Sequence, residues 1–321
     1  MRILVTGGAG FIGSHLCERL VKDGHLVTAI DNFSTGRASN LAQLEGSDRF
    51  TLVEGSILDY QLLTPLVTDA DYVFHLAAAV GVFNIVNNPL ASLLTNIRGT
   101  ENVLEAAYST KTPVFLTSSS EVYGKNISDS LKESDDRILG SPVTLRWSYS
   151  EAKAIDESLA YAYFFERQLE TRIVRFFNTV GPRQLGAYGM VVPRFIKSAI
   201  TNEPITIYGD GTQTRCFAHV YDVIDAAIAI AFAENTIGKV INIGNDFEIS
   251  INGLAQKIII ETKSKSEIVF IPYEEAYGGG FEDMERRVPN IDLINQLVGW
   301  KPKRDLTTII ADISAEMKKI P

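Results

Sequence analysis

One stretch decides the fold of this chain, RILVTGGAGFIG at residues 2–13. A short apolar run leads into a glycine-rich turn, and a helical pattern follows over residues 14–22. In such a strand, turn and helix, Gly7 and Gly10 permit a tight turn and the close approach of a pyrophosphate, while Gly13 lets helix and strand pack closely. The N-terminus of the helix favours the negative charge. The stretch therefore predicts a dinucleotide site.

The acidic residue that ends the next apolar run indicates which dinucleotide binds. Asp31 follows the glycine turn by about twenty residues, where a carboxylate accepts hydrogen bonds from both hydroxyls of an adenosine ribose. A 2′-phosphate would meet a like charge there, so NAD is favoured over NADP. Arg37 keeps NADP as the alternative, and Asn32 is expected to help hold the ribose.

Apolar runs alternate with helical patterns through the first half of the chain. This alternation predicts an α/β fold with a doubly wound parallel sheet of the Rossmann type. Its ligand crevice is expected beyond the carboxyl ends of the strands. The runs that read as buried parallel strands are residues 2–5, 26–31, 50–54, 72–76, 114–118 and 172–176.

The pattern changes after residues 181–182, where turns that contain Gly and Pro appear. A helix near residues 192–201 and a strand at residues 205–208 indicate a smaller substrate-binding part. A helix at residues 221–234 and a strand at residues 240–243 indicate that the chain then returns to the first domain. We therefore predict a cofactor domain over residues 1–175 with a return segment at about 216–243, and an interleaved C-terminal substrate domain over about 176–215 and 244–321.

The composition excludes several classes of protein. A formal net charge of -9 argues against a broad nucleic-acid surface. The only cysteines, Cys17 and Cys216, form neither a metal pattern nor a disulfide framework, so we expect reduced thiols in the cytoplasm. The longest apolar candidate, residues 223–233, contains Asp225, so no membrane span is expected. A small molecule is the expected partner, without metal, nucleic acid or membrane.

Ordered motifs extend over essentially the whole chain. They are TGGAGFIG at 6–13, DN at 31–32, HLAA at 75–78, NIRGT at 96–100, SSSEVYG at 118–124, YSEAK at 149–153, RFFN at 175–178, GPR at 181–183, YGDG at 208–211, QTR at 213–215 and GWKP at 299–302. Together they resemble the extended short-chain dehydrogenase/reductase family, which includes NAD-dependent nucleotide-sugar epimerases and dehydratases. One position departs from the family pattern, since Ser56 stands where many relatives carry an Asp that reaches the adenine. The resemblance implies cofactor contacts from Gly7, Gly10, Phe11, Ile12, Gly13, Asp31, Asn32, Ser56, Ile57, Ala77, Tyr149 and Lys153.

A tyrosine and a lysine four residues apart form the expected catalytic pair. Tyr149 and Lys153 share a face if their segment is helical. The lysine ammonium and the nicotinamide cation are expected to favour the phenolate form of a group whose ordinary pKa is about 10. Tyr149 then accepts the proton of the sugar 4-hydroxyl as hydride leaves C4 for NAD. The resemblance places Ser119 where it hydrogen-bonds the reacting hydroxyl.

The resemblance also implies a substrate site in the second half of the chain. It assigns the sugar-nucleotide diphosphate to Asn178, Arg215 and Arg287, and the guanidinium fork suits phosphate oxygens. Arg183 is expected to reach either the diphosphate or the sugar, and Tyr208 is expected to contact the substrate. Uridine diphosphate is the preferred carrier.

The two residues after Ser119 bear on the reaction that follows C4 oxidation. Simple C4 epimerases of the family commonly have a small or hydroxyl residue at the position of Glu121, whereas a glutamate there resembles nucleotide-sugar dehydratases. Ser120 replaces the aspartate that usual 4,6-dehydratases use as the acid for the leaving 6-hydroxyl. The favoured hypothesis is a UDP-hexose dehydratase, in which Glu121 removes H5, water leaves from C6 and hydride returns to C4, giving a 5,6-ene sugar.

That outcome resembles the UDP-N-acetylglucosamine dehydratase of tunicamycin biosynthesis, so UDP-N-acetylglucosamine is the suspected substrate. Ser120 and Glu121 also resemble UDP-glucuronate decarboxylases, with Arg215 at a position that can face the carboxylate. Plain C4 epimerisation is a further alternative. A protein that binds NAD without turnover is disfavoured by the intact Tyr149 and Lys153 pair.

We expect a homodimer, formed through helices near residues 96–108 and 149–169. The second of these segments carries Ile155 at helical spacing with other apolar residues, and Tyr161 and Phe165 add apolar surface around the helix.

Overall fold

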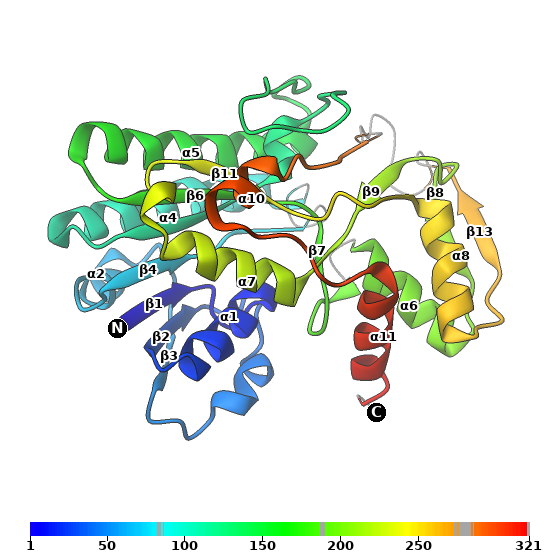
Figure 1. Cartoon of the computed structure of the whole chain (residues 1–321), viewed down its shortest axis with the longest axis horizontal. Helices are drawn as coiled ribbons and strands as arrows, with labels where there is room; N and C mark the ends of the chain where they lie inside the picture. The colour runs from blue at the N-terminus through cyan, green and yellow to red at the C-terminus, as the bar shows by residue number, and fades with distance from the viewer. Residues whose placement is uncertain are drawn as a thin grey trace.

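The computed structural model describes residues 1–81, 85, 87–186, 190–272, 275, 284 and 286–319. Seven parallel strands form its central sheet, in the order β11-β6-β5-β4-β1-β2-β3 (Figure 1). The predicted doubly wound parallel sheet is confirmed, and each of the six strands proposed from the sequence lies within a residue of its expected bounds. The strands are β1 Arg2–Thr6, β2 Leu26–Asp31, β3 Phe50–Glu54, β4 Tyr72–His75, β5 Val114–Ser119, β6 Thr171–Phe176 and β11 Val240–Ile243.

Helices cover both faces of this sheet (Figure 1). On one face α1 (Phe11–Lys22) packs against α7 (Val220–Ala231). On the other face α4 (Pro89–Thr110) packs between α2 (Tyr60–Thr68) and α5 (Ser148–Arg167). Every residue of β4 is buried, because a central parallel strand meets helices on both sides. The apolar runs of the sequence are therefore the middle layer of a three-layer lobe.

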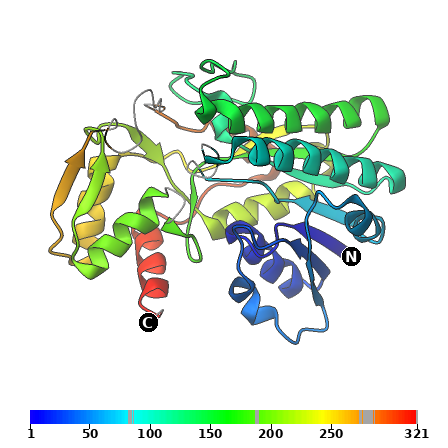
Figure 2. The ribbon, with the colours of Figure 1, turned by 180° about the vertical axis from the view of Figure 1, so that it is seen from behind.

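A second lobe lies to one side of the sheet (Figure 2). Its apolar core joins three helices, α6 (Val191–Thr201), α8 (Ile251–Thr262) and α11 (Leu306–Met317). Because β11 pairs with β6, the chain returns to the sheet between α6 and α8. The domain boundaries proposed from the sequence stay a prediction. The paired short strands are β7 Thr179–Val180 with β10 Ala218–His219, β9 Thr214–Cys216 with β12 Glu248–Ser250, and β8 Ile205–Tyr208 with β13 Ile268–Ile271.

Short helical turns complete the described chain. They are η1 Ala38–Leu44, η2 Ser120–Tyr123, η3 Leu145–Trp147, η5 Glu234–Thr236 and the short helix α10 Asp292–Val298. Two of them, η2 and η3, contact α5, and η2 directly follows the carboxyl end of β5. In the part of the chain that the structure describes, none of the helices has the length and apolar character needed to cross a membrane.

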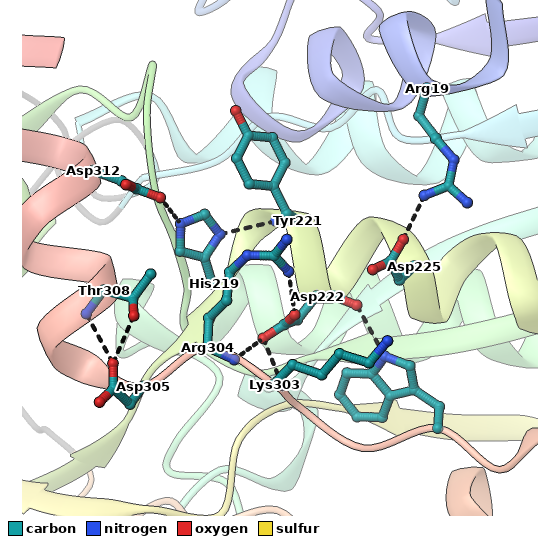
Figure 3. Close-up of polar contacts among 11 residues, drawn as sticks. Arg19, His219, Tyr221, Asp222, Asp225, Lys303, Arg304, Asp305, Thr308 and Asp312 are labelled. Carbon is teal, nitrogen blue, oxygen red and sulfur yellow. Dashed lines mark hydrogen bonds and ion pairs between the residues drawn. The ribbon is translucent and has the colours of Figure 1, made fainter. Parts of the chain in front are cut away.

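Hydrogen bonds and ion pairs join the C-terminal segment to α7 where the two lobes meet (Figure 3). Asp222 lies in the first turn of α7 and is 1% exposed. Its carboxylate accepts hydrogen bonds from the backbone N–H groups of Lys303 at 3.0 Å and Arg304 at 2.8 Å, and it pairs with the Arg304 guanidinium. His219, the N-cap of α7, places Nε2 3.1 Å from the Asp312 carboxylate of α11. These contacts fix the second lobe against the sheet.

Candidate active site

A cavity of about 520 Å³ lies between the two lobes. It opens along the carboxyl ends of the sheet strands, as expected for a doubly wound fold. Apart from Arg37, considered for the NADP alternative, every residue that the sequence singled out for cofactor, catalysis or substrate lines this one cavity, so the structure brings them together. Their individual roles stay predictions. The residues are Gly7, Gly10, Phe11, Ile12, Gly13, Asp31, Asn32, Ser56, Ile57, Ala77, Ser119, Ser120, Glu121, Tyr149, Lys153, Asn178, Arg183, Tyr208, Arg215 and Arg287.

The glycine turn between β1 and α1 leaves no space for side chains at Gly7 and Gly13. Gly7 has a φ of +71°, and a Cβ there would lie 2.8 Å from the backbone nitrogen of Ala77. A Cβ at Gly13 would lie 2.1 Å from the Gly7 carbonyl oxygen. Gly10 is the N-cap of α1 and has no side chain to cover the first helical N–H groups. This cradle fits a dinucleotide pyrophosphate, which would accept those N–H groups at the positive end of α1.

Asp31 ends β2 at the floor of the cavity and is 8% exposed. Its carboxylate accepts hydrogen bonds from the backbone N–H groups of Ala9 at 2.9 Å and Phe33 at 2.8 Å, and burial raises its pKa above the usual range. The two bonds hold the carboxylate in place and leave lone pairs for a ribose diol. By contrast, the Ser56 hydroxyl accepts from the N–H of Leu58 at 3.2 Å and so caps its own turn.

The predicted catalytic pair, Tyr149 and Lys153, has an acidic neighbour that the sequence analysis missed. Lys153 donates to the Thr117 carbonyl at 3.0 Å and to the Asp156 carboxylate at 3.1 Å. Burial raises the pKa of Tyr149 above its usual value, Glu121 and Asp156 add to the rise, and a hydrogen bond with Ser119 opposes it. Asp156 follows Lys153 by three residues on one helix, and that i, i+3 spacing was the available signal.

Glu121 sits between two buried arginines. Arg146 on η3 binds one carboxylate oxygen at 2.6 Å, and Arg287 binds the other at 2.8 Å; both arginine side chains are 6% exposed. Burial alone would raise the pKa of Glu121, but Arg287 and Arg146 together lower it to about 2. Arg287 also donates to the Ser120 hydroxyl at 3.3 Å. Sequence reasoning missed Arg146, whose only local signal is its place three residues before Tyr149.

The remaining predicted substrate residues line the wall formed by the second lobe. Arg215 donates to the Thr214 carbonyl at 2.8 Å, and the Asn178 amide donates to the Cys216 carbonyl at 2.9 Å. The Arg183 guanidinium is turned toward α1, where it binds Ser14 at 3.1 Å and Glu18 at 2.6 Å. Arg183 thus links the lobes beside the cavity.

The side chains on the substrate side give that part of the cavity a net positive charge. Arg194, which the sequence analysis also missed, lies over the Tyr208 ring at 4.5 Å and offers a flat platform beside it. Among the described lining residues beyond the catalytic pair, Glu121 is the single carboxylate on this side, against Arg146, Arg194, Arg215 and Arg287. Such a surplus suits a ligand that carries several negative charges.

Comparisons with known proteins agree with this geometry. Residues 3–244 match the model of the NAD dependent epimerase/dehydratase family. The chain is 43% identical over 302 residues to a UDP-N-acetyl-alpha-D-glucosaminuronate decarboxylase of Bacillus cytotoxicus, covering 94% of this chain and 92% of that protein. It is 37% identical over 303 residues to UDP-glucuronic acid decarboxylase 1 of Danio rerio, covering 94% and 69%. A solved UDP-glucuronic acid 4-epimerase from Bacillus cereus is similar over 100% of both chains, with 31% identity and a TM-score of 0.90.

Proposed function

Because the chain belongs to the NAD dependent epimerase/dehydratase family, we propose that it decarboxylates a UDP-hexuronate, with UDP-N-acetyl-α-D-glucosaminuronate as the first candidate. It is an enzyme of the class that contains NAD-dependent nucleotide-sugar epimerases, dehydratases and decarboxylases, and NAD is its cofactor. A decarboxylase of that sugar is 43% identical to the chain. The surplus of arginines in the cavity supports a substrate with a carboxylate in addition to its diphosphate.

The position of Glu121 between two arginines favours decarboxylation over dehydration. Dehydration requires a base for the C5 proton, and a carboxylate whose pKa is about 2 is a weak base. Arg146 and Arg287 also bind both of its oxygens. Decarboxylation needs no base at C5, because carbon dioxide leaves from that carbon. We therefore favour the decarboxylase alternative over the dehydratase, and a uronate over UDP-N-acetylglucosamine.

We assign the oxidation at C4 to Tyr149 and the residues around it. Its phenolate oxygen takes the proton of the sugar 4-hydroxyl, and Ser119, which hydrogen-bonds Tyr149, aligns that hydroxyl. The glycine turn and Asp31 would hold NAD in the same cavity, where it would supply the hydride acceptor for the oxidation and the hydride donor for the final reduction. No external redox partner would then be consumed.

Loss of the carboxylate follows from the ketone at C4, which makes the sugar a β-keto acid. The C5–C6 bond breaks, its electron pair forms an enolate across C4 and C5, and carbon dioxide leaves. A proton from solvent then adds to C5, and the C4 ketone is reduced. Arg146 and Arg287, which carry one more charge than Glu121 neutralises, stabilise the negative charge of the bound carboxylate and of the enolate.

C4 epimerisation of a uronate is the second candidate. It is favoured by the likeness to a UDP-glucuronic acid 4-epimerase over the full length of both chains. The reaction begins with the same oxidation at C4, but the sugar keeps its carboxylate and is reduced from the opposite face. The cavity residues described above serve either outcome, so the product decides between them.

Mass spectrometry of the products tests the proposal. Purified enzyme is incubated with UDP-N-acetylglucosaminuronate, UDP-glucuronate and UDP-N-acetylglucosamine, with Tyr149→Phe as the inactive control. We expect carbon dioxide to be lost from a uronate and no net consumption of NAD. A uronate of unchanged mass whose C4 is shown by proton NMR to be inverted would establish the epimerase instead, and loss of water from UDP-N-acetylglucosamine would restore the dehydratase.

A further inference from the structure

A buried ion pair, Lys153 with Asp156, follows the proposed catalytic residue Tyr149 on α5. Lys153 is 2% exposed and Asp156 is 0% exposed, and their charged groups are 3.1 Å apart. The Lys153 ammonium has three donors, of which one goes to Asp156 and one to the Thr117 carbonyl. Because Lys153 also lines the cavity, one N–H is left for the cofactor side.

A row of buried hydrogen bonds links the carboxyl ends of β1 and β4 to α4. Burial raises the pKa of Asp156, while Lys153 and the Thr100 hydroxyl lower it. The Thr100 oxygen lies 3.1 Å from His75 Nε2, and His75 Nδ1 lies 2.8 Å from the Thr6 hydroxyl. Thr6 in turn accepts from the backbone N–H of Ala77 at 3.1 Å. The row thus joins Thr100 of α4 to a backbone group at the cofactor end of the cavity.

One direction of these bonds gives each member a donor and an acceptor. The Thr6 oxygen accepts from Ala77 N–H, and the Thr6 hydroxyl donates to His75 Nδ1. His75 Nε2–H then donates to the Thr100 oxygen. Burial, and to a smaller extent Lys153, lower the pKa of His75 to about 3, which keeps the imidazole neutral as this tautomer requires. Every donor in the row therefore points toward Thr100.

The charged and polar groups around Tyr149 come from four elements. Glu121 lies on η2 and is bound by Arg146 of η3, Asp156 lies on α5 with its partner Lys153, and Ser119 at the end of β5 offers a hydroxyl. Burial and the two carboxylates raise the pKa of Tyr149, so the lysine does not act on it as an uncompensated cation. The neighbouring Glu157 is engaged by Arg175 at 2.7 Å.

We propose that Asp156 is a positioning residue that offsets the Lys153 charge and so keeps Tyr149 a neutral phenol until the cationic nicotinamide is bound. The oxidised cofactor then adds the positive charge that favours the phenolate. Once hydride has moved to the cofactor that charge is gone, and the phenol retains the proton it took from the sugar hydroxyl. Tyr149 can then return this proton when C4 is reduced. This role belongs to the oxidation step and is the same whichever reaction follows.

Direct titration of Tyr149 in cofactor-free protein tests the role. Phenolate formation is followed by ultraviolet absorbance against pH, with the Tyr149→Phe curve subtracted to remove the other tyrosines. Asp156→Asn keeps the shape of the side chain and removes its charge, so the Tyr149 titration should move down by about one pH unit. Glu151→Gln is the matched control, because it removes a carboxylate from the same helix that is 44% exposed and paired with Arg137; it should leave the titration unmoved.

A second measurement uses single-turnover hydride transfer in the loaded enzyme. Its rise with pH should shift in the same direction as the titration in Asp156→Asn and remain in place in Glu151→Gln. Should Asp156→Asn fail to fold, Asp156→Ser is smaller and carries the same expectation. A folded Asp156 variant whose Tyr149 titration is unchanged, or moves to higher pH, overturns the proposal.

Discussion

At the scale of single residues, the charge at the sugar end of the cavity is set by the Glu121 carboxylate and the two arginines that bind it. Arg146 binds one oxygen of Glu121, and Arg287 binds the other. Because each guanidinium takes a single oxygen, Arg146 can hold Glu121 while Arg287 turns to a substrate carboxylate. Under the proposed function, the pair of arginines therefore supplies both a fixed counter-ion and a group that binds the carboxylate of the uronate.

Removing Arg146 should weaken uronate binding specifically. In Arg146→Met, Glu121 has Arg287 as its remaining ion-pair partner from this cluster, so Arg287 is less available to a substrate carboxylate. We expect the affinity for a UDP-uronate to fall about tenfold, in line with the loss of one charge-assisted hydrogen bond. Calorimetry on NAD-loaded protein in the Tyr149→Phe background measures the affinity without turnover.

The comparison ligand for that prediction is UDP-N-acetylglucosamine, which lacks the carboxylate and should bind Arg146→Met as it binds the parent. Arg146→Lys keeps a positive charge beside Glu121 and should recover part of the uronate affinity. An equal loss of affinity for both ligands would show that Arg146 acts on the fold of the cavity and not on the carboxylate.

At the scale of elements, the sheet was predictable because parallel strands buried on both faces read as continuous apolar runs. The bounds of β1 to β6 follow from the sequence within a residue. The surroundings of Glu121 could not be predicted from the sequence, because segments far apart in the chain meet there and no local pattern marks the contact. Leu131 donates to the Val288 carbonyl at 2.8 Å and accepts from Asn290 N–H at 2.9 Å, which places the segment carrying Arg287 beside the loop that follows η2. Only the fold reveals that contact.

The junction of α7 with the C-terminal segment gives a prediction about stability. Asp222→Ala should remove the acceptor of two backbone N–H groups and the partner of Arg304 (Figure 3). Since Asp222 is 1% exposed, water cannot readily replace it, and we expect the free energy of unfolding to fall by about 3 kcal/mol. Asp225→Ala, on the same helix, is the control.

Asp225 pairs with Arg19, and the two side chains are 34% and 37% exposed. Loss of this half-exposed pair should cost less than about 1 kcal/mol. Urea unfolding of both variants measures the difference. If Asp222→Ala were no less stable than Asp225→Ala, the junction would not be what holds the second lobe in place.

At the scale of the whole molecule, function depends on two lobes that share one cavity. The sequence placed the cofactor residues in the first lobe and substrate residues in the second, and the cavity contains both sets. The homodimer expected through α4 and α5 stays a prediction. On α5, Phe165 is 73% exposed, Tyr161 is 49% exposed and Ile155 is 41% exposed, so the single chain leaves apolar surface on that helix.

Buried histidines should make the stability of the whole molecule depend on pH. Burial lowers the pKa of His15 to about 4 and that of His75 to about 3, from an ordinary value of 6.5. Below the ordinary value the unfolded chain binds protons that the folded chain does not, so acid favours unfolding. Each histidine should lower the free energy of unfolding by about 1.4 kcal/mol per pH unit between its ordinary and its folded pKa.

Urea unfolding at about pH 7, 6 and 5 measures this slope, in a range where most carboxylates remain ionised. His15→Gln removes one titrating group and keeps a side chain able to donate to the Pro182 carbonyl, which His15 Nε2 reaches at 3.0 Å. The variant should therefore lose stability less steeply with acid than the parent, even if it is less stable at pH 7. His75 should still titrate in that variant, so a residual slope is expected. Equal free energies of unfolding for the parent at pH 7 and pH 5 would show that these histidines take up protons in the folded state.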